Sequence, residues 1–375
     1  MKIAHIILYQ CDTPFTIPFH TPQTIRSRAD SILVKLLFDN GISGYGESAP
    51  RSYVTGETPE TVVHVIENRF SKILFDENIQ SIDDIERVLD TLETDCLKRD
   101  TEAYHSALGA IDIALLDAWG KFKKKPPHEF LYPIRSNSLR HSIPIPIVHE
   151  DVIRKIHSHV KHISFDSIKV LLDDRLNHSI ERVRFVRSLF GDHVRLRLEA
   201  NGKWSREQAV TSINELKRFN ISAVEQPVNR DDIEGLRYIR ITTGVPVVAD
   251  ESMCTLSEAE RLIAQEACDI INIKISKCGG LMKSRRIADF ARSNNVPCMV
   301  GAHVGETAIL HNAGKYFAMT LHDPFCFEGL SFLLYKDGWK DNHATHDAMD
   351  YSPGFFSEED LPKDSVKRIS TLSPR

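Results

Sequence analysis

The chain has 375 residues, of which 42% are hydrophobic, and it carries a formal net charge of −5. This length and composition allow a large buried core and two domains. The mild charge and the lack of a long basic run exclude a nucleic-acid surface, so we expect a small-molecule partner. No apolar stretch reaches about 18 residues and MKIAHIILYQ lacks a cleavage site, which predicts a cytoplasmic protein without a membrane span. The seven cysteines are odd in number and lack CxxC pairing, so they indicate neither a disulfide framework nor a zinc site.

Residues 1–125 predict an α+β domain. Alternating apolar residues predict the strands KIAHIILYQ, DSILVKLLF and ISGYGES, and Asp39-Asn40-Gly41 predicts a hairpin turn between the last two. Helical patterns follow at about 59–75, 81–95 and 102–122.

Two loops of this first domain are candidates for covering a neighbouring site. The apolar segment from Phe15 to Phe19 is interpreted as a loop between the first two strands, and YVTGET follows the third. In the covering role, Phe19 and Tyr53 would contact substrate. Ordinary surface loops with hydrophobic anchors remain the alternative.

The cluster KFKKKPP at 121–127 predicts a boundary, after which residues 126–339 alternate between strand and helix patterns. Such alternation is typical of a (β/α) barrel. Eight strands are expected, at about 142–148, 166–172, 194–199, 222–225, 246–250, 270–276, 296–301 and 325–328. The polar residues 340–375 predict a tail that packs on the first domain.

Four charged residues stand at the predicted ends of successive strands. Glu199, Glu225, Asp250 and Lys274 follow one another at intervals of 26, 25 and 24 residues, about one strand, one helix and two loops each. Barrel active sites lie at the C-terminal ends of the strands. The order of three acids and a lysine therefore indicates an active site.

The motifs IKVLL, LEAN, VEQP, ADES and NIKISKCGG, with GYGESAP and YVTGET, resemble the enolase superfamily and, within it, the muconate lactonizing enzyme subgroup. The resemblance covers nearly the whole chain. It implies an α+β capping domain on a modified (β/α)7β barrel of the TIM type. It also implies Glu199, Glu225 and Asp250 as ligands of Mg²⁺ or Mn²⁺, Lys274 as the acid/base, and Lys169 as the first lysine of a Lys-x-Lys motif. A homo-oligomer acting on a small carboxylate is expected.

The implied chemistry suits these residue types. Removing a proton next to a carboxylate leaves an enediolate, whose second negative charge an oxygen-ligated Mg²⁺ can meet. A lysine base must be partly neutral, and cationic neighbours lower its pKa. Supporting contacts to the ligand carboxylates are expected from Arg197, Asn201 and Glu251. An internal salt-bridge network without metal is the alternative, and it is disfavoured because three acids would face few inward bases.

Departures from the family pattern affect the predicted reaction. Glu199 stands where the subgroup usually has aspartate, and Leu171 stands where it has the second lysine of Lys-x-Lys. Two-base racemisation is therefore in doubt, whereas reactions with Lys274 alone stay open. His303 is a candidate substrate contact or proton donor. Cys326 and Glu328 stand where dipeptide epimerases of the family carry Asp-x-Asp for the substrate amine.

The predicted function is a Mg²⁺-dependent enzyme that forms an enolate from a carboxylate substrate, with a muconate-type cycloisomerase favoured. The alternatives are a dipeptide or amino-acid epimerase or racemase, an o-succinylbenzoate synthase-like lyase, and a metal-binding relic that has lost catalysis. A Schiff-base aldolase that uses Lys274 is a further alternative from a different class of enzyme.

Overall fold

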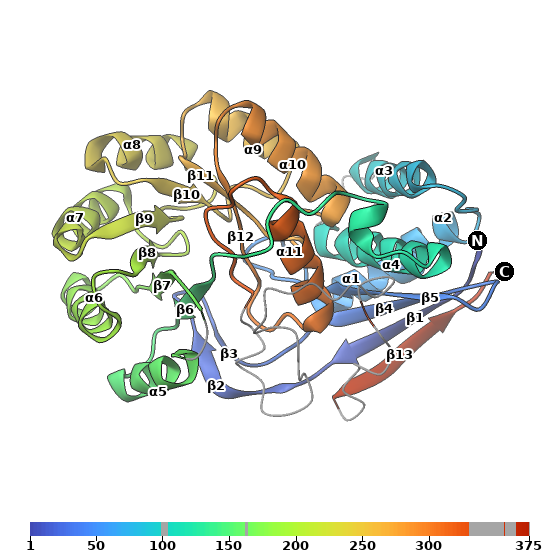
Figure 1. Ribbon diagram of the computed structural model, residues 1–375, viewed down its shortest axis with the longest axis horizontal. Coiled ribbons are helices and arrows are strands. Elements are labelled where there is room, and N and C mark those ends of the chain that lie inside the picture. The colour runs from blue at the N-terminus through green and yellow to red at the C-terminus, as the bar shows by residue number, and fades with distance from the viewer. Residues whose placement is uncertain (99–103, 162–163, 330–355, 357–364, 375) are drawn as a thin grey trace.

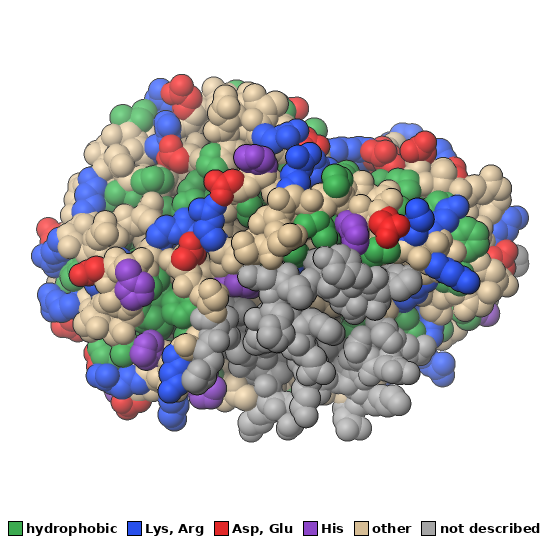
Figure 2. Space-filling model, viewed as in Figure 1, with side chains coloured by type: hydrophobic (Ala, Val, Ile, Leu, Met, Phe, Trp, Pro, Cys, Tyr) green, Lys and Arg blue, Asp and Glu red, His purple; other side chains and the backbone are tan. Residues whose placement is uncertain are grey.

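The computed structural model describes residues 1–98, 104–161, 164–329, 356 and 365–374. A barrel of parallel strands ringed by helices forms one part, on the left in Figure 1, and a smaller α+β unit lies against it on the right. This confirms the predicted fold, a modified (β/α)7β barrel of the TIM type with an N-terminal capping domain. Basic and acidic side chains are interspersed over the described part of the face in Figure 2, in line with the small net charge.

The capping domain is built on an antiparallel sheet in the order β13-β1-β4-β5. The strands are β1 (Ile3–Cys11), β4 (Ile32–Phe38), β5 (Ser43–Ser48) and β13 (Val366–Leu372). Much of the predicted tail lies outside the described residues, and its described part, β13, pairs with β1. Helix α4 (His105–Lys123) packs on β5 so closely that a side chain at Gly44 or Gly46 would overlap the helix backbone. Glycine is required at both positions.

Four further helical segments of the capping domain lie between β5 and α4 in the chain. The pattern at 59–75 forms one continuous helical run with a π-helical turn in its middle: α1 (Pro59–Val65), η1 (Ile66–Phe70) and α2 (Ser71–Leu74). Thr58 caps its first turn, and α3 (Ile82–Lys98) follows.

The interpretation of Phe15 to Phe19 as a loop is wrong, because this segment is a strand. Strand β2 (Pro14–His20) pairs with β3 (Ile25–Arg28) as an antiparallel hairpin. Its turn is fixed by the Thr21 hydroxyl, which accepts hydrogen bonds from the amides of Gln23 and Thr24. The prolines of β2 argue against a central strand, but both strands of a two-stranded ribbon are edges, where proline is tolerated.

Seven parallel strands follow in consecutive order: β6 (Ser142–Ile145), β7 (Ser167–Leu171), β8 (Arg195–Glu199), β9 (Ile221–Glu225), β10 (Val247–Ala249), β11 (Ile270–Ile273) and β12 (Cys298–Val300). The predicted eighth strand is reduced to single bridges, since Phe327 pairs with both Val300 and His141. These bridges link β12 to the segment before β6, which closes the barrel.

Helices follow the barrel strands and cover the outside of the barrel (Figure 1). They are α5 (Glu150–Val160), α6 (Leu176–Phe190), α7 (Arg206–Leu216), α8 (Ile233–Thr243), α9 (Leu256–Ala264), α10 (Leu281–Ser293) and α11 (Ala308–Thr320), with short 3₁₀ turns η2 (Pro127–Glu129) and η3 (Lys217–Phe219). Ser205 and Thr255 form capping boxes at the starts of α7 and α9.

Two carboxylates of the capping domain hold the N-termini of barrel helices. Glu47 of β5 accepts hydrogen bonds from the amides of Thr307 (2.8 Å) and Leu310 (3.1 Å) at the start of α11. Asp112 of α4 accepts one from the amide of Leu281 at the start of α10. Both side chains are fully buried. Each carboxylate accepts hydrogen bonds from backbone amides in the first turn of a barrel helix, where the helix itself offers no acceptor. These contacts join the two domains.

Glu47→Ala should lower the free energy of unfolding by about 2–4 kcal/mol, because it leaves buried amide donors of α11 without an acceptor. Urea denaturation measures this change. The matched control is Glu207→Ala, an exposed acid in the first turn of α7, which should stay within about 0.5 kcal/mol. Equal effects of the two substitutions would contradict the assigned role of Glu47.

Candidate active site

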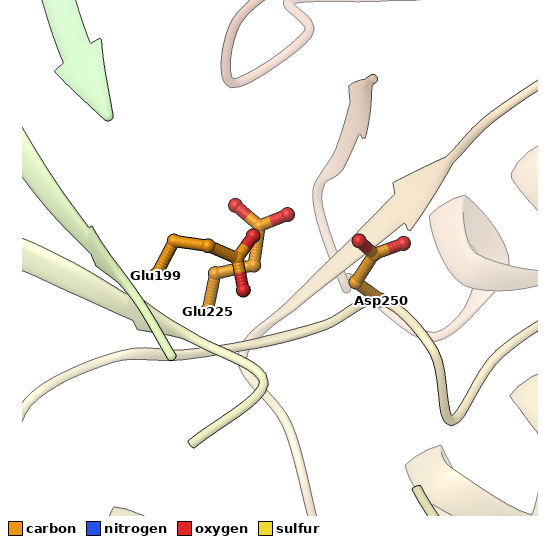
Figure 3. Close-up of side chains that lie close together, drawn as sticks. All are labelled: Glu199, Glu225 and Asp250. Carbon is orange, nitrogen blue, oxygen red and sulfur yellow. The ribbon is translucent and has the colours of Figure 1, made fainter. Parts of the chain in front are cut away.

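Three carboxylates converge at the C-terminal ends of neighbouring strands. Glu199 ends β8, Glu225 ends β9, and Asp250 directly follows β10. Glu199 is the register partner of Glu225, so both side chains leave the sheet at the same level. The three side chains lie close together (Figure 3). One oxygen from each acid lies within 4.8 Å of the others, and all three side chains are buried.

Two cationic side chains reach these acids from β7 and β8. The Lys169 Nζ atom lies 2.9 Å from Glu328, 3.4 Å from Glu199 and 3.6 Å from Glu225. The Arg197 guanidinium is ion-paired with Glu225, at 2.7 Å, and with Glu328. Arg197 therefore contacts a predicted ligand carboxylate as the sequence indicates, and Glu328 has a cation at each of its oxygens.

Asp250 is held by two more lysines. Lys274, just after β11, places its Nζ atom 2.6 Å from Oδ2 of Asp250. Lys277 is fully buried, and its Nζ atom donates to Oδ1 (2.8 Å) and the carbonyl oxygen (2.7 Å) of Asp250 and to the carbonyl oxygen of Asn272 (2.9 Å). Lys277 was not predicted as a site residue. The only sequence signal was its position one helical turn after Lys274.

The expectation of few inward bases is wrong. Among the described residues, the site gathers five carboxylates and four cationic side chains: Glu199, Glu225, Asp250, Glu251 and Glu328 with Lys169, Arg197, Lys274 and Lys277. Their formal sum is one negative charge. A divalent cation and one substrate carboxylate bring that sum to zero, so the set accommodates both together.

The pKa values of two ligand candidates, Glu199 and Asp250, are shifted in opposite directions. Burial and the neighbouring charge of Glu225 raise the pKa of Glu199 well above its usual value. Burial also acts to raise the pKa of Asp250, but the charges of Lys274 and Lys277 outweigh it and hold the pKa below the usual range. Glu199 is thus the acid whose charge is least compensated, as expected for a site that receives a hard cation. The three acids fit Mg²⁺, and their oxygen donors also fit Mn²⁺.

A pocket of about 150 Å³ lies between the barrel and the capping domain, and Glu199 is the one of the three acids that lines it. Lys169 and Lys274 both line it, from the second and sixth of the eight strand positions. Positions four apart in a ring of eight are opposite each other. The two lysines therefore face the pocket from opposite sides, with the three acids on the strands between them.

The structure brings most of the other predicted site residues to this pocket. Its lining includes Phe19 and Tyr53 of the capping domain together with Asn201, Glu251, His303 and Glu328 of the barrel. Asn201 donates its side-chain amide to Glu251 (3.2 Å) and its backbone amide to Glu199 (2.8 Å). The covering hairpin and the YVTGET segment therefore both reach the pocket.

The substrate-contact prediction for Cys326 and the proton-donor role considered for His303 need correction. Cys326 is fully buried in the barrel interior, in a cluster with Ala223, Val248, Ile270 and Met299, and it does not line the pocket. The Arg197 guanidinium donates a hydrogen bond to its sulfur. His303 lines the pocket, but burial and the charges of Lys274 and Arg51 hold its pKa well below the usual value. A neutral histidine does not fit the predicted role of proton donor.

Two family models match the chain. One, described as enolase C-terminal domain-like, matches residues 151–358, and the other, the mandelate racemase / muconate lactonizing enzyme N-terminal domain, matches residues 3–131. The chain therefore belongs to the enolase superfamily, as the motifs indicate. Within that superfamily it is an isomerase.

Similar proteins narrow the type of isomerase. A hydrophobic dipeptide epimerase from Enterococcus faecalis is 31% identical over 81% of this chain and 82% of that protein. An L-Ala-D/L-Glu epimerase from Clostridium acetobutylicum is 30% identical over 86% of this chain and 89% of that protein. The crystal structure of an N-succinyl Arg/Lys racemase from Bacillus cereus superposes with a TM-score of 0.88 at 26% identity and covers all of both chains.

The comparisons favour the epimerase alternative over the muconate-type cycloisomerase. A muconate lactonizing enzyme from Pseudomonas fluorescens has the same TM-score, 0.88, but only 21% identity over 98% of this chain and 99% of that one, so it shows the shared fold alone.

No helix among the described residues is both long and apolar enough to span a membrane.

Glu225→Gln removes one ligand charge and keeps the size of the side chain. We expect Mg²⁺ to bind at least about tenfold more weakly, because one of three charged oxygen ligands is lost. Calorimetric titration of Mg²⁺ measures this. The matched control is Glu215→Gln at a half-exposed position of α7, which should leave Mg²⁺ affinity unchanged. If Glu225→Gln also leaves it unchanged, Glu225 is not a ligand.

Proposed function

We propose that this chain is a magnesium-dependent epimerase or racemase of an amino-acid derivative. It removes the hydrogen from the carbon next to a free carboxylate on one face and returns a proton to the other face. The observation that carries the proposal is the placement of Lys169 and Lys274 on opposite sides of one pocket.

Inversion at carbon needs two proton-transfer groups, because the proton must leave on one side and arrive on the other. Lys169 on β7 and Lys274 after β11 provide one on each side. The acids on the three strands between them fix where the substrate carboxylate lies. The α-carbon of that carboxylate then falls between the two ammonium groups.

Lys169 therefore takes the role of the second base that the sequence left in doubt. Leu171, the residue in the family's second lysine position, lines the same pocket and is the register partner of Glu199. Lys169 lies on the same face of β7 two residues earlier, and its long side chain still reaches the pocket. With Leu171 in the second position of the Lys-x-Lys motif, β7 lacks one of the family's two lysines, but Lys169 in the first position still provides a side-chain amine.

Each lysine is kept charged by its present partners. Burial alone lowers the pKa of Lys274, but the charges of Asp250, Glu225 and Glu251 outweigh it and hold the pKa well above the usual value. Burial likewise lowers the pKa of Lys169, and the charges of Glu225, Glu328 and Glu199 raise it by more. Glu199, Glu225 and Asp250 would hold Mg²⁺, which would stabilise the developing negative charge of the substrate. Its positive charge would also offset the effect of these acids on the pKa values of the two lysines. One lysine then accepts the α-proton while the other, still protonated, donates.

The named relatives support this reaction over the other candidates. The relatives named above at about 30% identity are epimerases, and the muconate lactonizing enzyme named above is 21% identical. A Schiff-base aldolase is disfavoured because the named relatives at about 30% identity are epimerases. A relic without catalysis is disfavoured because both lysines and all three acids are retained.

The two-base proposal predicts different fates for the two lysine variants. In D₂O with Mg²⁺, the unmutated protein should exchange the α-hydrogen of both stereoisomers of a probe such as N-acetyl-leucine and interconvert them. Lys169→Ala and Lys274→Ala should each retain exchange with one stereoisomer, opposite for the two variants. Interconversion should fall by at least about 100-fold in both, because a general acid/base is lost.

Proton NMR and chiral chromatography measure exchange and interconversion. The control is Lys217→Ala, an exposed lysine after α7, which should behave as the unmutated protein does. Exchange that survives with a single stereoisomer also demonstrates that the variant is folded. Full interconversion by Lys169→Ala would contradict the assignment of Lys169 as the second base.

A further inference from the structure

Lys277 is a fully buried cation that binds the framework of the metal site. Its Nζ atom donates to Oδ1 of Asp250 at 2.8 Å, to the carbonyl oxygen of Asp250 at 2.7 Å and to the carbonyl oxygen of Asn272 at 2.9 Å. An ammonium group has three donors, and each of them has an acceptor here. Lys274 lines the pocket, whereas Lys277 lies outside its lining. Lys277 therefore has no direct part in proton transfer to a substrate.

These contacts fix Asp250 at both its backbone and its side chain. Because the carboxylate and the carbonyl of one residue bind the same nitrogen atom, neither can turn without breaking a charge-assisted hydrogen bond. The third contact ties the segment after β10 to β11, where Asn272 donates its side-chain amide to Glu225 at 2.8 Å. The positions of two ligand candidates, Asp250 and Glu225, therefore share one support.

Asp250 is the ligand candidate with the most restricted position. Glu199 and Glu225 each have one rotatable bond more than an aspartate, so their oxygens can reach a wider range of positions. Both oxygens of Asp250 bind lysines, at 2.8 Å for Lys277 and 2.6 Å for Lys274. A carboxylate oxygen has two lone pairs, so Asp250 can keep its contact with Lys277 while it binds an ion.

A ligand in a fixed position favours Mg²⁺ over Ca²⁺. Mg²⁺ requires nearly octahedral oxygen ligands at about 2.0–2.1 Å, whereas Ca²⁺ accepts oxygen ligands at about 2.3–2.6 Å in flexible arrangements. The two ions carry the same charge, so the number of charged ligands alone discriminates little between them. The rigidity of the ligands is what separates them.

We infer that Lys277 is a positioning residue of the metal site: by fixing Asp250, it holds the three acids in an arrangement that selects Mg²⁺ over the larger Ca²⁺. The inference rests on the proposed function, which takes the three acids as ligands of the ion. It separates the roles of two lysines that are three residues apart. Lys274 acts on the substrate, and Lys277 acts through Asp250.

The ratio of Mg²⁺ affinity to Ca²⁺ affinity tests the inference, and calorimetric titration of each ion without substrate measures it. In Lys277→Met the long side chain remains without its charge, and the ratio should fall at least about fivefold because Asp250 is no longer fixed. Lys277→Arg keeps the charge. Its planar guanidinium does not place three donors around one nitrogen atom as an ammonium does, so the ratio should fall there too.

Lys169→Met is the charge-matched control. The Lys169 Nζ atom lies 3.4 Å from Glu199 and 3.6 Å from Glu225, so the substitution removes a positive charge next to the acids while Lys277 still holds Asp250. The affinities for the two ions should change by similar factors, and their ratio should stay within about twofold. Far-UV circular dichroism checks that each variant is folded.

The possible failures are distinguishable. An unchanged ratio in a folded Lys277 variant would overturn the inference and leave the two-base proposal standing, as would an equal fall in Lys169→Met. Unmutated protein that binds Ca²⁺ as tightly as Mg²⁺ would also overturn it, whether or not the variants fold. If the unmutated protein binds neither ion, the acids are not a metal site, and the proposed function fails together with the inference.

Discussion

The crowding of buried carboxylates at the ends of adjacent parallel strands is the constraint on which this structure depends. Parallel pairing places Glu199 opposite Glu225, with Asp250 on the next strand, so their charges cannot move apart without breaking the sheet. Buried like charges are tolerated only when cations or a metal ion compensate them. Four buried bases and a site for a divalent cation provide that compensation, and the same cations then serve the chemistry.

The capping domain completes the site through the same kind of polar contact. Asp112 reaches the start of α10, just beyond the segment that carries Lys274 and Lys277. A side chain at Gly280, whose φ is +106°, would overlap the Asp112 carboxylate. The glycine there is needed for this close approach as well as for its backbone conformation. Because Glu47 anchors α11 in the same way, the hairpin that covers the pocket is attached to a unit joined to the barrel at two buried points.

The periodic part of the site could be predicted from the sequence, because strand ends repeat at the spacing of a βα unit. That spacing located Glu199, Glu225, Asp250 and Lys274 at one end of the barrel. The compensation of charge could not be predicted, since it depends on contacts made only when the ring closes. Lys169 meets Glu328 across 159 residues, and the burial of Cys326 among side chains of four other strands likewise depends on the closed barrel.

The central claim is that Lys169 and Lys274 lie on opposite faces of the reacting carbon while the three acids hold the ion that binds its carboxylate. A crystal structure with Mg²⁺ and an unreactive α-methyl analogue of an N-acylated amino acid tests it most directly. We predict both Nζ atoms about 3–3.5 Å from the α-carbon on opposite faces, and one oxygen of each acid about 2.0–2.1 Å from the ion. Both lysines on one face, or Lys169 still bound to Glu328 and out of reach of the α-carbon, would contradict the account.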